Sequence, residues 1–211
     1  MIETIGVNDT EALGVLKQAF ADHPILPSDM APQSREKLLE LVVGACGRTG
    51  KAWLHGIRKD GALACVAMSL DAHFEPRGPA LLWLLFQVFR VLGWRMTRGF
   101  VGAFSKRPKY DDRYLELMLL GTLPAYQGQG LGRTMLGFLY GFAKAQGCRG
   151  VILDAVPETP ACRFYLKESF VVDSEITVNS VPLCNMRRED ASGPPMPIDP
   201  TVVAERKEMT S

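Results

Sequence analysis

A glycine-rich hexapeptide, Gln-Gly-Gln-Gly-Leu-Gly at residues 127–132, stands between two segments of different hydrophobic period. Before it, residues 113–122 (RYLELMLLGT) are strand-like, and after it, residues 131–146 place apolar side chains at helical spacing. Residues 151–155 (VILDA) then predict a buried strand. The order strand, glycine loop, helix, strand predicts a βαβ unit, whose two strands are parallel and joined by a right-handed crossover.

Antiparallel hairpins are predicted on both sides of this unit. Residues 52–57 and 62–70 are β-like and are joined through Asp60-Gly61, a strong hairpin signal. Residues 170–178 and 181–188 form a second pair. The predicted helices are one after the caps Asn8, Asp9 and Thr10, one that opens at Pro32 and carries Cys46 on its apolar side, and a short one from Thr159 to Glu168. The predicted fold class is α/β: one domain over residues 1–190, with a mixed six- to seven-stranded sheet, a central βαβ unit and helices on both faces.

Composition excludes several classes of protein. With 211 residues, 47% hydrophobic and 22% charged, the chain is not disordered. A net charge of +1 provides no field to hold a polyanion, so no nucleic-acid partner is expected. The apolar segment 79–96 is interrupted by Gln87 and Arg90 and is too short to span a bilayer, so no membrane insertion is expected. Residues 79–92 are interpreted as a buried or partner-facing helix, with a membrane-surface helix as the alternative, and the proline-rich residues 191–211 as a loosely packed tail.

The cysteines and histidines give no sign of a disulfide framework or a metal site. The five cysteines are scattered and none is spaced as C-x-x-C, while the three histidines stand far apart. Lone thiols are typical of a reducing compartment, and the N-terminus lacks the apolar segment of a signal peptide. We therefore expect a cytoplasmic protein with no bound metal.

The glycine loop predicts a site for a phosphate or a pyrophosphate. Gly128, Gly130 and Gly132 lack a Cβ and let the backbone approach a ligand closely. They precede a helix, whose first N–H groups have no intrahelical partner and favour negative charge. Arg133 adds a forked cation. Other phosphate loops fit less well, because no Gly-Lys-Ser/Thr follows and a dinucleotide fingerprint would need glycine at position 133. A glycine-rich turn with no ligand is the structural alternative.

In this context, Gln127–Gly132 matches Q/R-x-x-G-x-G/A, and the chain resembles the GNAT superfamily of acetyl-coenzyme A-dependent N-acetyltransferases. Ala161–Phe170 resembles the family's A-x-x-F-Y-x-x-x-G-F segment, and Pro182–Arg188 is similar to its last strand. Glu158 stands where the family often has asparagine, and Ser169 stands where glycine is common.

The resemblance implies acetyl-coenzyme A as the cofactor and coenzyme A as a product. It implies that the amide-bearing arm of the cofactor lies along the backbone of Leu120 and Thr122, like an added strand. The residues implied to hold the pyrophosphate are Gln127, Gly128, Gly130, Leu131, Gly132 and Arg133. Of these, Leu131 is expected to anchor the helix in the core.

Two residues are candidates for the chemistry. Glu116 lies in an apolar strand, where an ionised side chain is costly unless it has a role or a partner. It stands six residues before Thr122, where several family members carry a basic glutamate, and it shares strand parity with Leu120 and Thr122. A general base for the amine is its implied role, with an ordered water or a structural ion pair as the alternatives. Tyr165 is at the position of the family tyrosine that protonates the leaving sulfur, with a packed structural tyrosine as the alternative.

The activity implied is transfer of an acetyl group to a primary amine by direct reaction in a ternary complex. The acceptor is expected to be a small molecule and would be selected by the variable regions 22–34 and 71–112. A non-catalytic acyl-coenzyme A sensor or partner-binding domain on the same fold is the alternative function. A homodimer is possible.

Overall fold

The computed structural model describes residues 1–24, 30–47, 51–71, 113–178 and 180–189, together with positions 86, 89, 90, 93 and 110. The tail 191–211 and most of the apolar segment 79–92 lie outside the described residues. Among the helices that the structure does describe, none is long and apolar enough to cross a membrane.

The described residues form a seven-stranded sheet with four α-helices, and this confirms the α/β class. The strands are β1 (Ile2–Ile5), β2 (Ala52–Lys59), β3 (Ala62–Asp71), β4 (Tyr114–Thr122), β5 (Gly150–Ala155), β6 (Val171–Val178) and β7 (Val181–Arg188). The helices are α1 (Thr10–Phe20), α2 (Pro32–Gly47), α4 (Leu131–Ala145) and α5 (Pro160–Lys167), and Pro124–Tyr126 forms a turn of 3-10 helix. Strand β1 was not predicted, because four residues at a sheet edge are too few for a clear alternation.

The strands are ordered β1-β2-β3-β4-β5-β7-β6. Neighbours are antiparallel except for β4 and β5, which are parallel and joined through α4, as the βαβ prediction requires. The β2–β3 turn has left-handed backbone at Asp60 (φ 52°) and Gly61 (φ 81°), which confirms the Asp-Gly hairpin. In the β6–β7 turn Ser180 is left-handed (φ 71°), and Asn179 lies outside the described residues.

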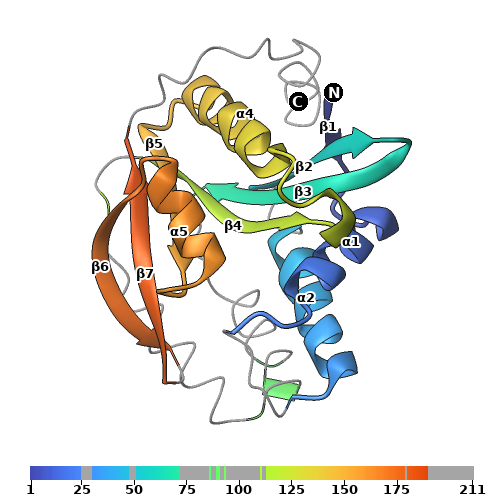
Figure 1. Ribbon diagram of the computed structural model, residues 1–211. Coiled ribbons are helices and arrows are strands. Elements are labelled where there is room, and N and C mark those ends of the chain that lie inside the picture. The colour runs from blue at the N-terminus through green and yellow to red at the C-terminus, as the bar shows by residue number, and fades with distance from the viewer. Residues whose placement is uncertain are drawn as a thin grey trace, which may run out of the picture.

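Helices lie on both faces of the sheet (Figure 1), and a hydrophobic core is packed on each face. On one face, α4 and α5 pack Met135, Leu139 and Tyr165 against strand residues such as Leu115 and Leu153. On the other face, α1 and α2 pack Leu16 and Val43, among others, against β2 and β3. We refer to these as the α4/α5 face and the α1/α2 face.

Two residues that depart from the family pattern adopt left-handed backbone. Glu158 has φ 62° and Ser169 has φ 66°. Asparagine and glycine are the residues that tolerate this conformation best, so their usual presence at these two positions has a conformational reason. Both substitutions bring local strain rather than a change of fold.

His55 is a fully buried polar residue under α4. It is 0% exposed, and its ring packs edge-on against Phe138 and Phe142, with centroids 4.8 Å from each. Neither ring nitrogen has a hydrogen-bond partner among the described residues. Burial without a partner disfavours the imidazolium and lowers the pKa of His55 to about 4.

We predict that this histidine makes the fold acid-sensitive. The unfolded chain binds a proton at His55 near its ordinary pKa of 6.5, whereas the folded chain binds one only near pH 4. The free energy of unfolding is therefore not reduced by His55 above pH 6.5. It decreases as the pH falls from 6.5 toward 4, and the total decrease approaches about 3 kcal/mol. Urea unfolding of the wild type and of His55→Leu between pH 4 and 7 measures this loss. The free energy of unfolding of His55→Leu should depend less steeply on pH than that of the wild type. An equal dependence on pH would contradict the lowered pKa of His55.

Candidate active site

Strands β4 and β5 run together for three residue pairs and then part. Tyr114, Leu115 and Glu116 pair with residues 150–152, and the pairing stops there. Beyond that point β4 stays paired with β3 as far as Thr122, and β5 stays paired with β7 as far as Ala155. Among the described residues, no second strand therefore pairs with the β4 edge from Leu117 to Thr122, and we call this interval the opening in the sheet. Its main-chain N–H and C=O groups can pair with an additional extended chain.

A β-bulge in β4 lies beside this opening. Opposite β3, Met68 pairs with Leu119 and Ser69 pairs with Leu117, so Met118 is the extra residue. Leu115 and Leu117 belong to the α4/α5 face, whereas Met118 and Leu119 pack on the α1/α2 face. The bulge shifts the alternation of side chains by one residue.

This shift corrects the prediction that Glu116 shares a face with Leu120 and Thr122. Leu120 packs on the α4/α5 face. Glu116 points to the α1/α2 face, where its charge acts on Cys46 of α2. Burial, with a further contribution from Glu116, raises the pKa of the Cys46 thiol to about 12. Simple period-2 counting was wrong here because the bulge leaves no mark in the sequence.

Glu116 is also the last β4 residue paired with β5, opposite Ile152. It is half-buried at the vertex where the two strands part. A carboxylate at this position can meet a group that enters the opening from the α1/α2 face.

The glycine loop follows β4 after the 3-10 turn Pro124–Tyr126 and is held by its own glutamines. The Gln127 side-chain amide donates to the main-chain oxygen of Thr122 at 3.2 Å, and Gln129 donates to Ala125 at 3.0 Å. Gly128 and Gly130 have φ of 72° and 80°, and a Cβ at either would meet nothing within 4 Å. The loop thus combines a backbone that demands glycine with open space beside it.

The N-terminus of α4 has no side-chain cap. Its N-cap is Gly130, and its first turn carries no acidic residue. By contrast, Asp9 caps α1 by accepting from Ala12 N at 2.8 Å, and Thr159 caps α5 by accepting from Cys162 N at 3.2 Å. An uncapped helix start facing open space is suited to an anionic group.

The first turn of α4 packs on α5. Leu131 packs against the core of the α4/α5 face, which confirms its expected anchoring role. A Cβ on Gly132 would lie 3.4 Å from the Phe164 ring, so this glycine permits close packing of the two helices. Arg133 donates from Nε to Oε1 of Glu168 at 2.7 Å.

Tyr165 lies on α5, on the same face as the glycine loop. It is 8% exposed and its ring contacts Phe164 and Phe170, with centroids 5.3 and 5.6 Å away. Burial raises the pKa of the Tyr165 hydroxyl well above its usual range, and the nearby Tyr140 and Cys65 act in the same direction. The hydroxyl therefore keeps its proton at neutral pH.

The structure thus groups most of the predicted site residues and separates one. Leu120 and Tyr165 belong to the side of the sheet that α4 and α5 cover, and Thr122 is on the same side through a side-chain hydrogen bond with Cys65. The glycine loop and Arg133 lie at the start of α4, whereas Glu116 lies on the other side of the sheet. Two residues near the loop were missed from the sequence. Lys59 of β2 donates to the Gln129 side chain, and Glu168 binds Arg133. The two contacts join residues that are separated in the sequence by 70 and 35 positions, so no local sequence pattern predicts them.

These features fit the diphosphate and amide-bearing arm of an acyl-coenzyme A. The open β4 edge matches the extended arm, and the uncapped start of α4 beside Gly128 and Gly130 matches the diphosphate. No group of metal-ligating side chains is found in the part of the chain that the structure describes. All five cysteines are buried thiols.

Comparison with known proteins identifies the family. The model of the acetyltransferase (GNAT) family matches residues 65–170, half of the chain, and the chain belongs to this family. No protein of curated function matches the sequence.

Solved structures share the fold across most of the chain. Arylalkylamine N-acetyltransferase 2 from Aedes aegypti is 18% identical over 90% of this chain and 98% of its own, with a TM-score of 0.65. The histone acetyltransferase HPA2 and related acetyltransferase from Corynebacterium glutamicum is 20% identical over 94% and 98%, with a TM-score of 0.60. The PaiA N-acetyltransferase from Thermoplasma acidophilum, solved with coenzyme A, is 16% identical over 90% and 98%, with a TM-score of 0.54. At these identities they show the fold alone.

Proposed function

We propose that this protein transfers an acetyl group from acetyl-coenzyme A to a primary amine of a small molecule, by direct reaction in a ternary complex. The observation that carries the proposal is the parting of β4 from β5 next to an uncapped, glycine-lined helix start. The Aedes aegypti neighbour, named an arylalkylamine N-acetyltransferase, supports a small amine as the acceptor class.

The chain's main-chain groups would bind the cofactor. The edge of β4 at Leu120 and Thr122 would hydrogen-bond the amide-bearing arm. Gln127 fixes the loop, and the N–H groups at residues 128–133 would bind the diphosphate, with Arg133 adding positive charge. Bound acetyl-coenzyme A supplies an acetyl group on a thioester sulfur.

Glu116 and Tyr165 would move the protons from opposite faces of the sheet. An alkylamine has a pKa of about 10.4, so it must lose a proton before its nitrogen attacks. Glu116 would accept that proton, directly or through a water, at the vertex of the opening. As the carbon–nitrogen bond forms and the carbon–sulfur bond breaks, the Tyr165 hydroxyl would give its proton to the sulfur. The new amide nitrogen would lose its second proton to the resulting tyrosinate through water, and Glu116 would release its proton to solvent. The raised pKa of Tyr165 keeps that proton available.

Calorimetry with acetyl-coenzyme A tests the proposed binding site. We expect wild-type protein to bind, and Gly130→Val to lose binding, because a β-branched side chain opposes φ 80° and fills the space beside the loop. Gly137→Ala is the matched control, since it lies in the same helix with nothing within 4 Å of its Cβ and should bind normally. No heat of binding for the wild type at about 1 mM ligand, a concentration at which even a weak complex of about 4 kcal/mol forms, would refute the proposal.

We predict that Tyr165→Phe lowers turnover with little change in the affinity for acetyl-coenzyme A. Loss of a general acid typically costs about 10²-fold or more in rate. The Tyr140→Phe variant changes the neighbouring buried hydroxyl and serves as the control. The readout is coenzyme A release across a panel of amines. Binding without turnover by the wild type across a broad panel would favour the sensor function.

For Glu116→Gln we predict a changed pH–rate profile. Without the carboxylate, the acidic limb of kcat/KM that reports its ionisation should disappear, while cofactor binding persists. If the variant retains the acidic limb unchanged, Glu116 is not the general base, and an ordered water would accept the proton of the amine instead.

A further inference from the structure

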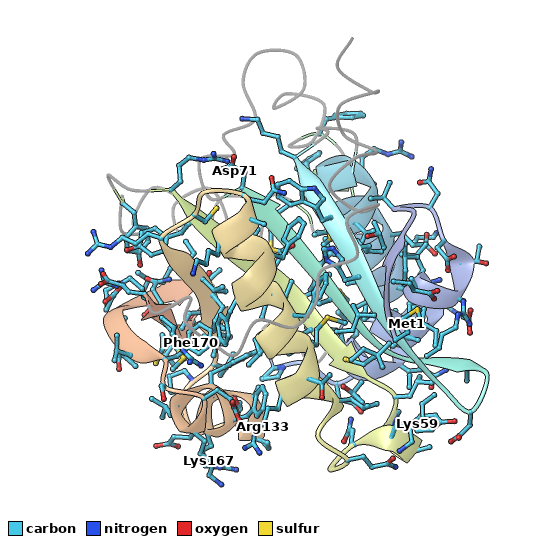
Figure 2. All side chains as sticks on the ribbon, turned by 90° about the horizontal axis from the view of Figure 1, so that it is seen from above. Met1, Lys59, Asp71, Arg133, Lys167 and Phe170 are labelled. Atoms are coloured by element: carbon cyan, nitrogen blue, oxygen red, sulfur yellow. The ribbon has the colours of Figure 1, made fainter. Side chains whose placement is uncertain are left out.

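The ion pair between Arg133 and Glu168 connects the two helices that border the glycine loop. Arg133 lies in the first turn of α4, and Glu168 follows the last residue of α5. The Arg133 side chain is 72% exposed, whereas that of Glu168 is only 12% exposed. In Figure 2, Arg133 lies beside α5, close to the labelled Lys167. The carboxylate of Glu168 is thus mostly covered by the protein, whereas the guanidinium of Arg133 is exposed to solvent.

The main chain of Glu168 is held from two sides. Its N–H donates to the carbonyl oxygens of Phe164 and Tyr165, both at 3.0 Å. Its own carbonyl accepts from Nη1 of Arg188 at 2.7 Å. With the backbone held and the side chain only 12% exposed, the Glu168 carboxylate has little room to move, and its ion pair restrains Arg133 in turn.

The geometry of the pair leaves the outer part of the guanidinium available. Glu168 accepts from Nε of Arg133 at 2.7 Å, so with respect to the described residues the two terminal nitrogens, with their four N–H groups, remain for other acceptors. A free arginine would lose its side-chain freedom on binding an anion, and prior fixation removes part of that cost.

We infer that Glu168 is a positioning residue, which holds Arg133 in place to bind the diphosphate of the cofactor. This inference rests on the proposed function. One turn earlier on α5, Phe164 packs on Gly132, so α5 touches the first turn of α4 at two consecutive residues. The guanidinium half of this ion pair is largely exposed to solvent, so the pair should add little to fold stability, and the effect of Glu168 should be seen in ligand affinity.

A double-mutant cycle tests the inference by calorimetric titration of coenzyme A into the wild type, Glu168→Ala, Arg133→Ala and the double variant. We expect Kd to rise about five-fold for Glu168→Ala and about ten-fold for Arg133→Ala, as expected for one weakened or lost charged hydrogen bond. The double variant should match Arg133→Ala, because Glu168 acts only through the arginine. A rise in Kd of about fifty-fold for the double variant, the product of the two single effects, would overturn the positioning role. An unchanged or lower Kd for Glu168→Ala would overturn it as well.

Further variants separate positioning from structure. Gln can still accept a hydrogen bond from Nε, so Glu168→Gln should retain most of the affinity. Glu36→Ala removes an exposed ion pair with Lys17, 3.4 Å long and on the other face, and should leave Kd unchanged. Thermal unfolding midpoints of all variants should remain close to that of the wild type. A low midpoint for Glu168→Ala, together with no rescue by Gln, would make the residue structural.

The choice of ligand identifies the group that is bound. Dephospho-coenzyme A keeps the diphosphate and lacks the 3′-phosphate. Glu168→Ala should therefore weaken the binding of dephospho-coenzyme A about as much as it weakens the binding of coenzyme A. An effect that vanishes with dephospho-coenzyme A would overturn the assignment to the diphosphate. If the wild type binds neither ligand, the proposed function fails and this inference fails with it; if the wild type binds and Glu168→Ala binds equally well, only the positioning role fails.

Discussion

The main-chain hydrogen bonds of β4 set the constraint on which the site depends. A strand in the middle of a sheet normally has both edges paired, because an unpaired N–H or C=O group away from water is costly. Here β3 occupies one edge of β4 along its length, while β5 leaves the other after Glu116 to remain with β7. The opening therefore begins where β5 stays with β7, two residues before the bulge at Met118 of β4.

The same strand separates the two candidate proton-transfer residues. The bulge at Met118 places Glu116 on the α1/α2 face, whereas Leu120 packs with the helices that carry the glycine loop and Tyr165. A reaction at the vertex of the opening would then have its proton donor and its proton acceptor on opposite sides of one sheet. This arrangement keeps the buried, protonated tyrosine and the carboxylate apart from each other.

Much of this architecture could be predicted from the sequence because it depends on local patterns. The strand–loop–helix–strand order, the Asp60-Gly61 turn and the caps at Asp9 and Thr159 each have a short-range physical cause, and each is found. The bulge, the short edge strand β1 and the contacts of Lys59 and Glu168 depend on pairing between distant segments. A single sequence records no such pairing, so the face of Glu116 was predicted wrongly and the partner of Arg133 was not predicted at all.

The uncapped start of α4 also has a thermodynamic consequence for the whole chain. Helix-end donors that no side chain satisfies must rely on water, so the free protein forgoes stability that a cap such as Asp9 provides to α1. Any anion that binds the folded loop and not the unfolded chain returns that stability in proportion to the logarithm of its concentration. The resistance of the protein to heat and to proteases would then report how much ligand its surroundings contain.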